Sequence, residues 1–272
     1  LLELKNQVFQ NLKKPILKHR AVVIPDQHFP IADRKAINVA LKIIERVKPD
    51  RFINLGDVLE NSEVSAWKYK GKALPSLEFQ LPMIDKMLEE CNKWIDEFDD
   101  MLEWVNCKDK WILAGNHDEW LDNFVNSKVG SHPVLKEYTF RKACRWDDRG
   151  YVYKNYNDPL RLGKIAFIHG AYATKYSASK HLEAYGSNII FGHTHSIERH
   201  TLTKLEGGTI GAWSMGCLKS KKAENNKWLR GRLHTWSHCV GIVDWFSNGN
   251  FKVEQVEIVD GATSLWGEMI YG

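Results

Sequence analysis

Residues 110–118 have the sequence KWILAGNHD, and this stretch decides the fold. Its first five residues form a short apolar run that predicts a buried strand. Gly115 lets the backbone turn sharply where that strand ends. Asn116 and His117 then lie at the carboxyl end of the strand, where open α/β sheets place their ligands. An amide oxygen binds a hard cation, and an imidazole binds a metal or transfers a proton. The stretch therefore predicts an α/β sheet with a polar site at one edge.

The same pattern, an apolar strand that ends in Asp, Asn or His, occurs five times in the chain. The other strands are predicted at 21–24, 51–55, 164–168 and 188–191. The clusters that follow them are Asp26-Gln27-His28, Gly56-Asp57, His169-Gly170 and Gly192-His193-Thr194-His195. Five recurrences in one chain are hard to explain without a shared metal centre.

Seven side chains in these clusters are candidate metal ligands: Asp26, His28, Asp57, Asn116, His169, His193 and His195. They offer hard oxygen and imidazole donors without a thiolate, which suits Mn²⁺, Fe or Zn²⁺. Seven ligands are too many for one tetrahedral zinc but suit two ions that share a carboxylate. A purely structural metal site is disfavoured, because such sites are closed and rarely need two ions.

The remaining chain predicts alternating helices and strands. Helical periodicity appears over 32–47, 81–106 and 174–185, with two shorter helices over 120–144. Further strands are predicted at 151–153, 198–205, 209–213, 238–245 and 251–259, with hairpin turns at Gly207-Gly208 and Asn248-Gly249. Residues 60–79 are expected to form an irregular lid or loop beside Asp57. This pattern predicts two packed sheets with helices outside.

The ordered set Asp-x-His, Gly-Asp, Gly-Asn-His-Asp, His-Gly and Gly-His-Thr-His, from residue 26 to residue 195, resembles the calcineurin-like metallophosphoesterases. The segment after residue 210 is most similar to small members found in bacteriophages and prophages. The resemblance implies a four-layer α/β/β/α sandwich of two mixed sheets flanked by helices. It also implies hydrolysis of phosphate esters with two divalent ions, Mn²⁺ first and Fe, Zn²⁺ or Ni²⁺ as alternatives.

The resemblance assigns a role to each candidate residue. One ion would be held by Asp26, His28, Asp57 and His195. The other would be held by Asp57, Asn116, His169 and His193, with Asp57 as the bridge. Such paired ions clamp the phosphoryl group and acidify a shared water for in-line attack on phosphorus.

Two residues outside the ligand set complete the expected catalytic group. His117 matches the histidine that protonates the leaving oxygen. Glu60 stands where relatives carry the acid that orients this histidine, and a solvent-facing loop glutamate is the alternative.

One position departs from a branch of that family. The Ser/Thr protein phosphatases carry a phosphate-gripping arginine directly after the acid, and this chain has Asn61 there. The departure favours phosphodiesters, with nucleic acids or nucleotides among the substrates. A phosphomonoesterase of broad or protein specificity is one alternative, and a non-catalytic binding scaffold that holds metal is another. Arg199 either replaces the missing arginine or is a surface strand residue.

Residues 218–236 are predicted to form one wall of the substrate groove. Their basic side chains are Lys219, Lys221, Lys222, Lys227, Arg230 and Arg232, against the single acid Glu224. Trp228 is interleaved with these bases, and Trp236 follows the last of them. Cations and indoles in this mixture are typical of a groove for single-stranded nucleic acid. The alternative is a mobile hairpin with its tryptophans in the core. The substrate contacts predicted from these patterns are Lys221, Lys222, Trp228, Arg230 and Arg199.

The bulk composition limits the class of protein. With 272 residues, 43% hydrophobic and 26% charged, the chain suits one large domain over 21–272, preceded by a basic arm over 1–20. The net charge of +4 does not itself require nucleic acid. Five scattered cysteines argue against a disulfide framework and fit a reducing compartment.

We expect a cytoplasmic protein, in the host cytoplasm if a phage encodes it, because no leader or membrane-spanning run is present. The chain begins at Leu1 and not at Met, which leaves a preceding segment open. The sequence also leaves the oligomeric state open.

Overall fold

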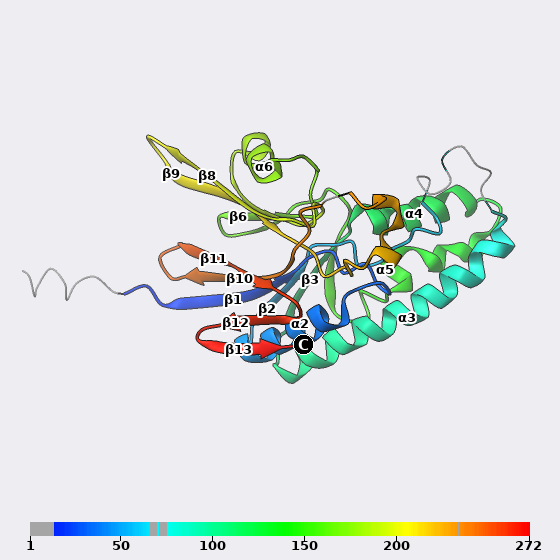
Figure 1. Cartoon of the computed structure of the whole chain (residues 1–272), viewed down its shortest axis with the longest axis horizontal. Coiled ribbons are helices and arrows are strands. Elements are labelled where there is room, and N and C mark those ends of the chain that lie inside the picture. Colours follow the sequence, from blue (N-terminus) through cyan, green and yellow to red (C-terminus); the bar gives the residue numbers. More distant parts are fainter. Residues whose placement is uncertain (1–13, 66–69, 71–74, 233) are drawn as a thin grey trace, which may run out of the picture.

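The structure is a computed structural model that describes residues 14–65, 70, 75–232 and 234–272 (Figure 1). A six-stranded sheet has the order β11-β10-β1-β2-β3-β4. Its strands are β1 (Leu17–Ile24), β2 (Arg51–Asn54), β3 (Asp109–Leu113), β4 (Tyr151–Lys154), β10 (His238–Phe246) and β11 (Phe251–Ile258). Strands β1 to β4 are parallel, and β10 and β11 continue the sheet in antiparallel fashion.

A second sheet of five strands has the order β5-β6-β7-β9-β8. Its strands are β5 (Leu160–Leu162), β6 (Ile165–Ile168), β7 (Asn188–Phe191), β8 (Ile197–Lys204) and β9 (Gly208–Met215). Strands β6, β7 and β9 are parallel, and the two edge strands β5 and β8 are antiparallel to their neighbours. Both sheets are therefore mixed.

The helices lie on the two outer faces. They are α2 (Arg34–Val47), α3 (Leu77–Trp104), α4 (Asn116–Lys128), α5 (Phe140–Ala143) and α6 (Ser177–Tyr185), with short 3₁₀ turns η1 (Pro133–Tyr138), η2 (Ala223–Asn225) and η3 (Lys227–Leu229). Helices α2 to α5 share a core with the six-stranded sheet, and α6 shares one with the five-stranded sheet. Figure 1 shows α6 and α2 on opposite sides of the sheets. The predicted four-layer α/β/β/α sandwich is confirmed.

Alternation along β1 explains how one strand serves two cores. Ala21 and Val23 face the space between the sheets, where they join Phe167 of β6 and Met215 of β9. Val22 and Ile24 face the helices. Successive side chains of a strand point to opposite faces, so a run of apolar residues is needed to bury both.

The N-terminal boundary differs from the expectation. Strand β1 begins at Leu17, so the last four residues of the predicted arm over 1–20 belong to the sheet. Arg20 is fixed there because its guanidinium donates to both carboxylate oxygens of Asp244, at 2.6 and 2.9 Å. Residues 1–13 of the arm lie outside the described residues, as do 66–69 and 71–74 of the lid expected over 60–79.

Two further features were not predicted. The long helix α3 begins at Leu77 and not near residue 81, and it contains Pro82 near its start. A C-terminal hairpin of β12 (Ala262–Leu265) and β13 (Glu268–Tyr271) lies beside α2. In the described part of the chain, no helix combines the length and apolarity needed to cross a membrane.

Candidate metal centre

Loops from three neighbouring strands of the larger sheet bring the first candidate ligands together. Asp26 follows β1, Asp57 follows β2 and Asn116 follows β3. Backbone hydrogen bonds join the first two loops: Asp26 N donates to Gly56 O at 3.2 Å, and His28 N donates to Asp57 O at 2.9 Å. These loops meet because the carboxyl ends of neighbouring parallel strands share one edge of the sheet.

The smaller sheet supplies the remaining histidines at the same place. His169 follows β6, and His193 and His195 follow β7. Asp26 connects the two sheets, because both of its carboxylate oxygens accept from His193 N, at 2.9 and 3.0 Å. The site is therefore built across the ends of both sheets.

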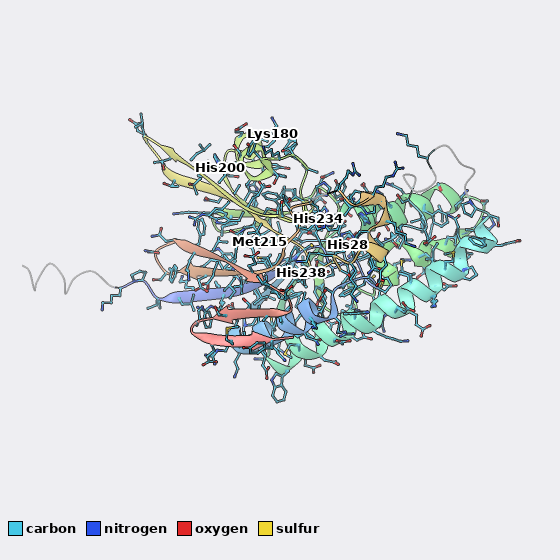
Figure 2. All side chains as sticks on the ribbon, in the orientation of Figure 1. His28, Lys180, His200, Met215, His234 and His238 are labelled. Carbon is cyan, nitrogen blue, oxygen red and sulfur yellow. The ribbon has the colours of Figure 1, made fainter. Side chains whose placement is uncertain are left out.

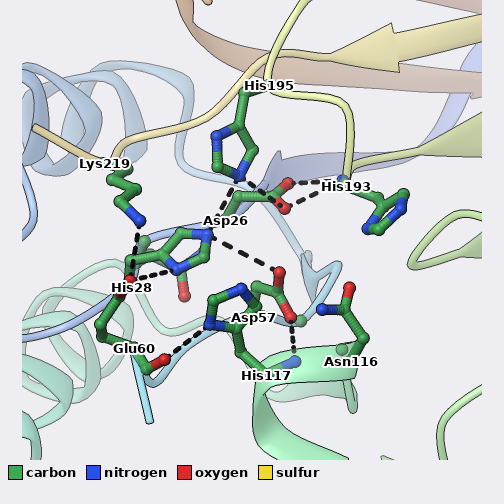
Figure 3. Close-up of polar contacts among 12 residues, drawn as sticks. Asp26, His28, Asp57, Glu60, Asn116, His117, His193, His195 and Lys219 are labelled. Carbon is green, nitrogen blue, oxygen red and sulfur yellow. Dashed lines mark hydrogen bonds and ion pairs between the residues drawn. The ribbon is translucent and has the colours of Figure 1, made fainter. Parts of the chain in front are cut away.

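All seven candidate ligands lie in one cluster. Figure 3 labels all of them except His169. Two groups have ligand atoms within 4.8 Å of one another: Asp26, His28, Asp57 and His195, and then Asp57, His169 and His193. Asn116 Oδ1 adjoins the second group, 3.1 Å from His169 Nε2. Asp57 belongs to both groups. The arrangement matches the division of ligands between two ions that the family resemblance implies.

Most of these ligands have a backbone conformation that residues other than glycine rarely adopt. The φ angle lies in the left-handed region for Asp26 (36°), His28 (53°), Asp57 (48°), His193 (67°) and His195 (58°). Each such residue costs of the order of 1–3 kcal/mol, and they gather at sites that need a side chain aimed in one direction. The surrounding hydrogen bonds maintain this strain at the cluster.

Two glycines let the carboxylates approach the loops closely. A Cβ atom on Gly115 would lie 2.2 Å from Asp57 Oδ1, and one on Gly192 would lie 2.2 Å from Asp26 Oδ2. Neither distance is possible for a real side chain. The glycines of Gly-Asn-His-Asp and Gly-His-Thr-His are therefore required by the position of the two carboxylates.

Hydrogen bonds at Nδ1 fix the tautomers of three histidines. Nδ1 of His28 donates to Glu60 Oε2 at 2.8 Å, and Nδ1 of His169 donates to Leu55 O at 2.8 Å. Nδ1 of His117 donates to Glu60 O at 2.6 Å. In each neutral imidazole Nε2 then carries a lone pair. Orientation of this kind is typical of metal-binding histidines.

The donor set fits a cation. Nε2 of His28 and Nε2 of His195 face each other at 3.0 Å, and both lie 3.6 Å from a carboxylate oxygen, of Asp57 and Asp26 respectively. Nδ1 of His195 is buried, and none of the described residues forms a hydrogen bond with it. Two nitrogens and two carboxylates that converge in this way suit an ion shared between them.

A third group, His28, Glu60 and His117, also has close ligand atoms. Its contacts need no ion, because both histidines donate to Glu60.

Electrostatics at the cluster follow from burial and from the neighbouring charges. Burial alone would raise the pKa of Asp57, but the charges of His169 and His117 and the hydrogen bond from His169 bring it well below its usual value. Burial lowers the pKa of His169, yet Asp57 raises it to about 9. Burial and the charge of His169 lower the pKa of His193 to about 4. In the protein without metal, the proton on His169 therefore offsets the Asp57 carboxylate.

Glu60 contacts His117 with a different group from the one predicted. Its backbone carbonyl binds His117, while its carboxylate binds His28 and accepts from Lys219 Nζ at 2.8 Å. Burial would raise the pKa of Glu60, but His28 and Lys219 lower it to about 2. The prediction is thus corrected: the carboxylate supports His28, and the main chain supports His117.

Lys219 also differs from the prediction for the basic segment. Its side chain is only 4% exposed and is therefore not available at the surface. The segment that carries it runs beside the first ligand loop, with Leu218 N donating to Asp26 O at 2.9 Å and Ser220 N donating to Ile31 O at 2.9 Å. His238 lies behind it and donates through Nε2 to Lys219 O at 2.9 Å. Lys219 is therefore an internal partner of Glu60.

Asp118 is a further residue that the sequence did not single out. This buried carboxylate accepts from Gly115 N at 2.8 Å and Leu59 N at 3.0 Å. Burial and the nearby Asp57 raise its pKa well above the usual value. It holds the loops after β2 and β3 together. Its place at the end of Gly-Asn-His-Asp was the only signal available.

A cavity of about 820 Å³ opens above the cluster. Asp57, Asn116, His117, His193 and His195 form its floor. It extends along residues 173–179 and 194–200 as far as His200, and it also reaches Trp228, Thr235 and Trp236. His200 is labelled on β8 in Figure 2.

The cavity separates the predicted substrate contacts into two sets. Arg199 and Trp228 line it. Lys221, Lys222 and Arg230 are exposed and do not line it. Lys175 and Tyr176 line it as well and were not predicted, because nothing in the sequence marks the loop before α6.

Asn61 takes no part in the cavity. Its side chain is buried, and Nδ2 donates to His117 O at 2.9 Å. The position that carries a phosphate-gripping arginine in the protein phosphatases therefore presents no cation here.

The chain was also compared with known proteins. No family model and no curated protein matches it. Among solved structures it is similar to YfcE, a phosphoesterase from E. coli, with 14% identity over 87% of this chain and 98% of that chain, at a TM-score of 0.39. It is also similar to Vps29 from Chaetomium thermophilum, with 10% identity over 88% of this chain and 95% of that chain, at a TM-score of 0.35. The residues of the site, and not these distant likenesses, carry the functional proposal.

Proposed function

We propose that this protein is a metal-dependent phosphoesterase that uses two divalent ions, with Mn²⁺ as the first choice and Fe, Zn²⁺ or Ni²⁺ as alternatives. The observation that carries the proposal is the sharing of Asp57 between two groups of candidate ligands, all of them buried except the half-buried His193. When bound, the ions supply Lewis-acid stabilisation of the phosphoryl oxygens and a water nucleophile of lowered pKa. A non-catalytic scaffold, which is the alternative, would have no need of a proton donor, yet His117 lines the cavity beside the ligands.

His117 is positioned to protonate the leaving oxygen. Its Nδ1 is taken by Glu60 O, which leaves Nε2 as the nitrogen that can hold and deliver a proton. Its backbone N donates to Asp57 Oδ1 at 2.8 Å, which ties it to the ligand cluster. Its ring packs between those of His28 and Trp120, with centroids 4.6 and 3.8 Å away. The imidazole is therefore held in one orientation.

Phosphodiesters are the preferred substrates in this proposal. A phosphate monoester carries a second negative charge, and the buried Asn61 offers no cation to bind it. The phosphomonoesterase alternative therefore lacks the phosphate-binding arginine that would support it. A panel of bis-p-nitrophenyl phosphate, p-nitrophenyl phosphate and a phosphoserine peptide with Mn²⁺ tests the preference. Turnover of the diester at least as fast as that of the monoester is expected. A strong preference for the peptide would favour a protein phosphatase, and no turnover of any ester would favour a scaffold.

Nucleic acids, and nucleotides that contain a phosphodiester, are the substrates that the exposed bases beyond the cavity favour. Lys221, Lys222 and Arg230 are exposed beyond the cavity and could contact a phosphate backbone that continues out of it. The double substitution Lys221→Glu and Lys222→Glu should weaken oligonucleotide binding and flatten its salt dependence. Binding equal to that of the wild type would remove these lysines from the proposal. The sequence resemblance to small phage members adds the host cytoplasm as the proposed location.

A further inference from the structure

A series of ring contacts leads outward from the metal-ligand cluster to the edge of the cavity. The indole of Trp236 meets the imidazole of His195 edge to face, with centroids 4.6 Å apart. Trp228 meets Trp236 in turn, at 5.9 Å. Both indoles line the cavity that contains Asp57 and His117. The cavity therefore has an aromatic wall that begins at a candidate ligand.

Trp228 is unusual among the tryptophans that the structure describes. Its side chain is 58% exposed, whereas Trp146, Trp213 and Trp245 are buried. Two others are exposed, but neither lines the cavity: Trp104 lies on α3, and Trp266 contacts the guanidinium of Arg20, 4.8 Å from its ring centroid. An indole in water loses the stabilisation that burial gives. Its open face suits a planar ligand.

Local hydrogen bonds on both sides of Trp228 brace the loop that carries it. Asn226 is buried, and its Nδ2 donates to Ser220 O at 2.8 Å and Lys222 O at 2.9 Å. Arg232 donates through Nε to Leu229 O at 3.0 Å. An indole fixed by its own loop can stack on a ligand with little loss of freedom.

The place of Trp228 selects the kind of planar group. A ring esterified directly to phosphorus would lie next to Trp236, one ring contact from the cluster. Trp228 lies one ring contact further out, so a ring that stacks on it needs a spacer, such as a sugar, between itself and phosphorus. Lys227 and Arg230 flank Trp228, and no ion pair to either is found in the described residues. Cations beside an aromatic face match a base that carries further phosphates.

We propose that the open face of Trp228 is a stacking subsite for a nucleobase, so that the hydrolysed ester carries a nucleoside. This inference rests on the proposed phosphoesterase function, and it names the substrate class of the same site.

The test compares esters that share one leaving group. They are methyl p-nitrophenyl phosphate and the 5′- and 3′-(p-nitrophenyl phosphate) esters of thymidine, assayed with Mn²⁺. The wild type should have a higher kcat/KM for at least one thymidine ester than for the methyl ester. Trp228→Ala should lower the ratio of these two kcat/KM values by about tenfold, mainly through KM. Trp228→Phe, which keeps an aromatic face, should retain most of the ratio. Trp104→Ala is the matched control and should leave the ratio unchanged.

A second readout needs no turnover. In the presence of EDTA, thymidine 3′,5′-bisphosphate should quench part of the tryptophan fluorescence, and Trp228→Phe should remove that part. Quenching that persists in Trp228→Phe, or a thymidine-to-methyl ratio that survives Trp228→Ala, would overturn the subsite. Equal kcat/KM for all three esters in the wild type would overturn it too. Hydrolysis of none of the esters by the wild type would instead overturn the phosphoesterase function.

Discussion

The backbone carbonyl oxygen of Glu60 accepts a hydrogen bond from Nδ1 of His117 at 2.6 Å, while the carboxylate of the same residue accepts one from Nδ1 of His28. A side-chain substitution at Glu60 therefore leaves the His117 contact in place. We expect Glu60→Gln to act on the metal site, because the amide of a glutamine is a weaker, uncharged acceptor for His28. Loss of a hydrogen-bond partner of a ligand histidine typically costs about 10–100-fold in metal affinity.

Two measurements distinguish a role of the Glu60 carboxylate in metal binding from a role in protonating the leaving group. Calorimetric titration of the metal-free Glu60→Gln protein with Mn²⁺ should show weaker binding. At saturating Mn²⁺, the dependence of kcat on the pKa of the leaving alcohol should match that of the wild type. A steeper dependence would mean that the carboxylate supports His117 after all.

Replacement of His117 should have the opposite signature. His117→Ala removes a proton donor and no predicted ligand, so Mn²⁺ occupancy should be retained. General acid catalysis contributes about 10²–10⁴-fold, and we expect a loss in that range for alkyl esters. Nitrophenyl esters need less protonation and should lose less. Equal losses for nitrophenyl and alkyl esters would argue against an acid role.

Asp57→Asn should lower the occupancy of both ions, because Asp57 is the carboxylate common to the two ligand groups. Elemental analysis of the metal-loaded proteins should give two ions per chain in the wild type and clearly fewer in the variant, which should also lose most activity. One ion per chain in the fully loaded wild type would contradict the shared-carboxylate arrangement.

The candidate ligands could be predicted from the sequence because each is marked by the residues next to it in the chain. Each candidate ligand follows an apolar run, and parallel strands bring such positions to one edge of a sheet. That reasoning needs only the order of the segments. The four-layer fold followed from the same alternation of helices and strands.

Contacts between distant segments could not be predicted in this way. Lys219 pairs with Glu60 across 159 residues, and in the sequence it is one lysine of a basic run. The left-handed backbone at residues such as Asp57 leaves no trace in the sequence either. The role of the Glu60 carbonyl was hidden because every residue has one, and only the fold decides which of them meets a histidine.

Metal uptake should be linked to a proton on His169. Without metal its pKa lies at about 9, above its ordinary value of 6.5, because the favourable interaction with Asp57 outweighs burial. A raised pKa stabilises the folded metal-free protein fully below pH 6.5, and this contribution is lost as the pH rises through about 9. If His169 holds an ion through Nε2, that nitrogen must give up its proton.

The apparent affinity for Mn²⁺ should therefore rise with pH between about 6.5 and 9, the range over which the metal-free protein loses the stabilisation that protonated His169 provides. Calorimetry in buffers of different ionisation enthalpy should detect proton release at neutral pH. His169→Gln should bind metal more weakly and release fewer protons. Equal proton release by this variant and the wild type would assign the proton to another group.

The contributions of Lys219 and Glu60 to the free energy of unfolding should depend on each other. Lys219→Met leaves the largely buried Glu60 carboxylate short of one charged partner, and a hydrogen bond to a charged group contributes about 2 kcal/mol. We expect the free energy of unfolding in urea, measured with EDTA present, to fall by about that amount. Lys221→Met, at an exposed lysine two positions away, is the matched control and should change it little. The double variant Glu60→Gln and Lys219→Met removes both charges, so its loss should be smaller than the two single losses combined. Additive losses would show that the two side chains stabilise the fold independently, and that their 2.8 Å contact contributes little.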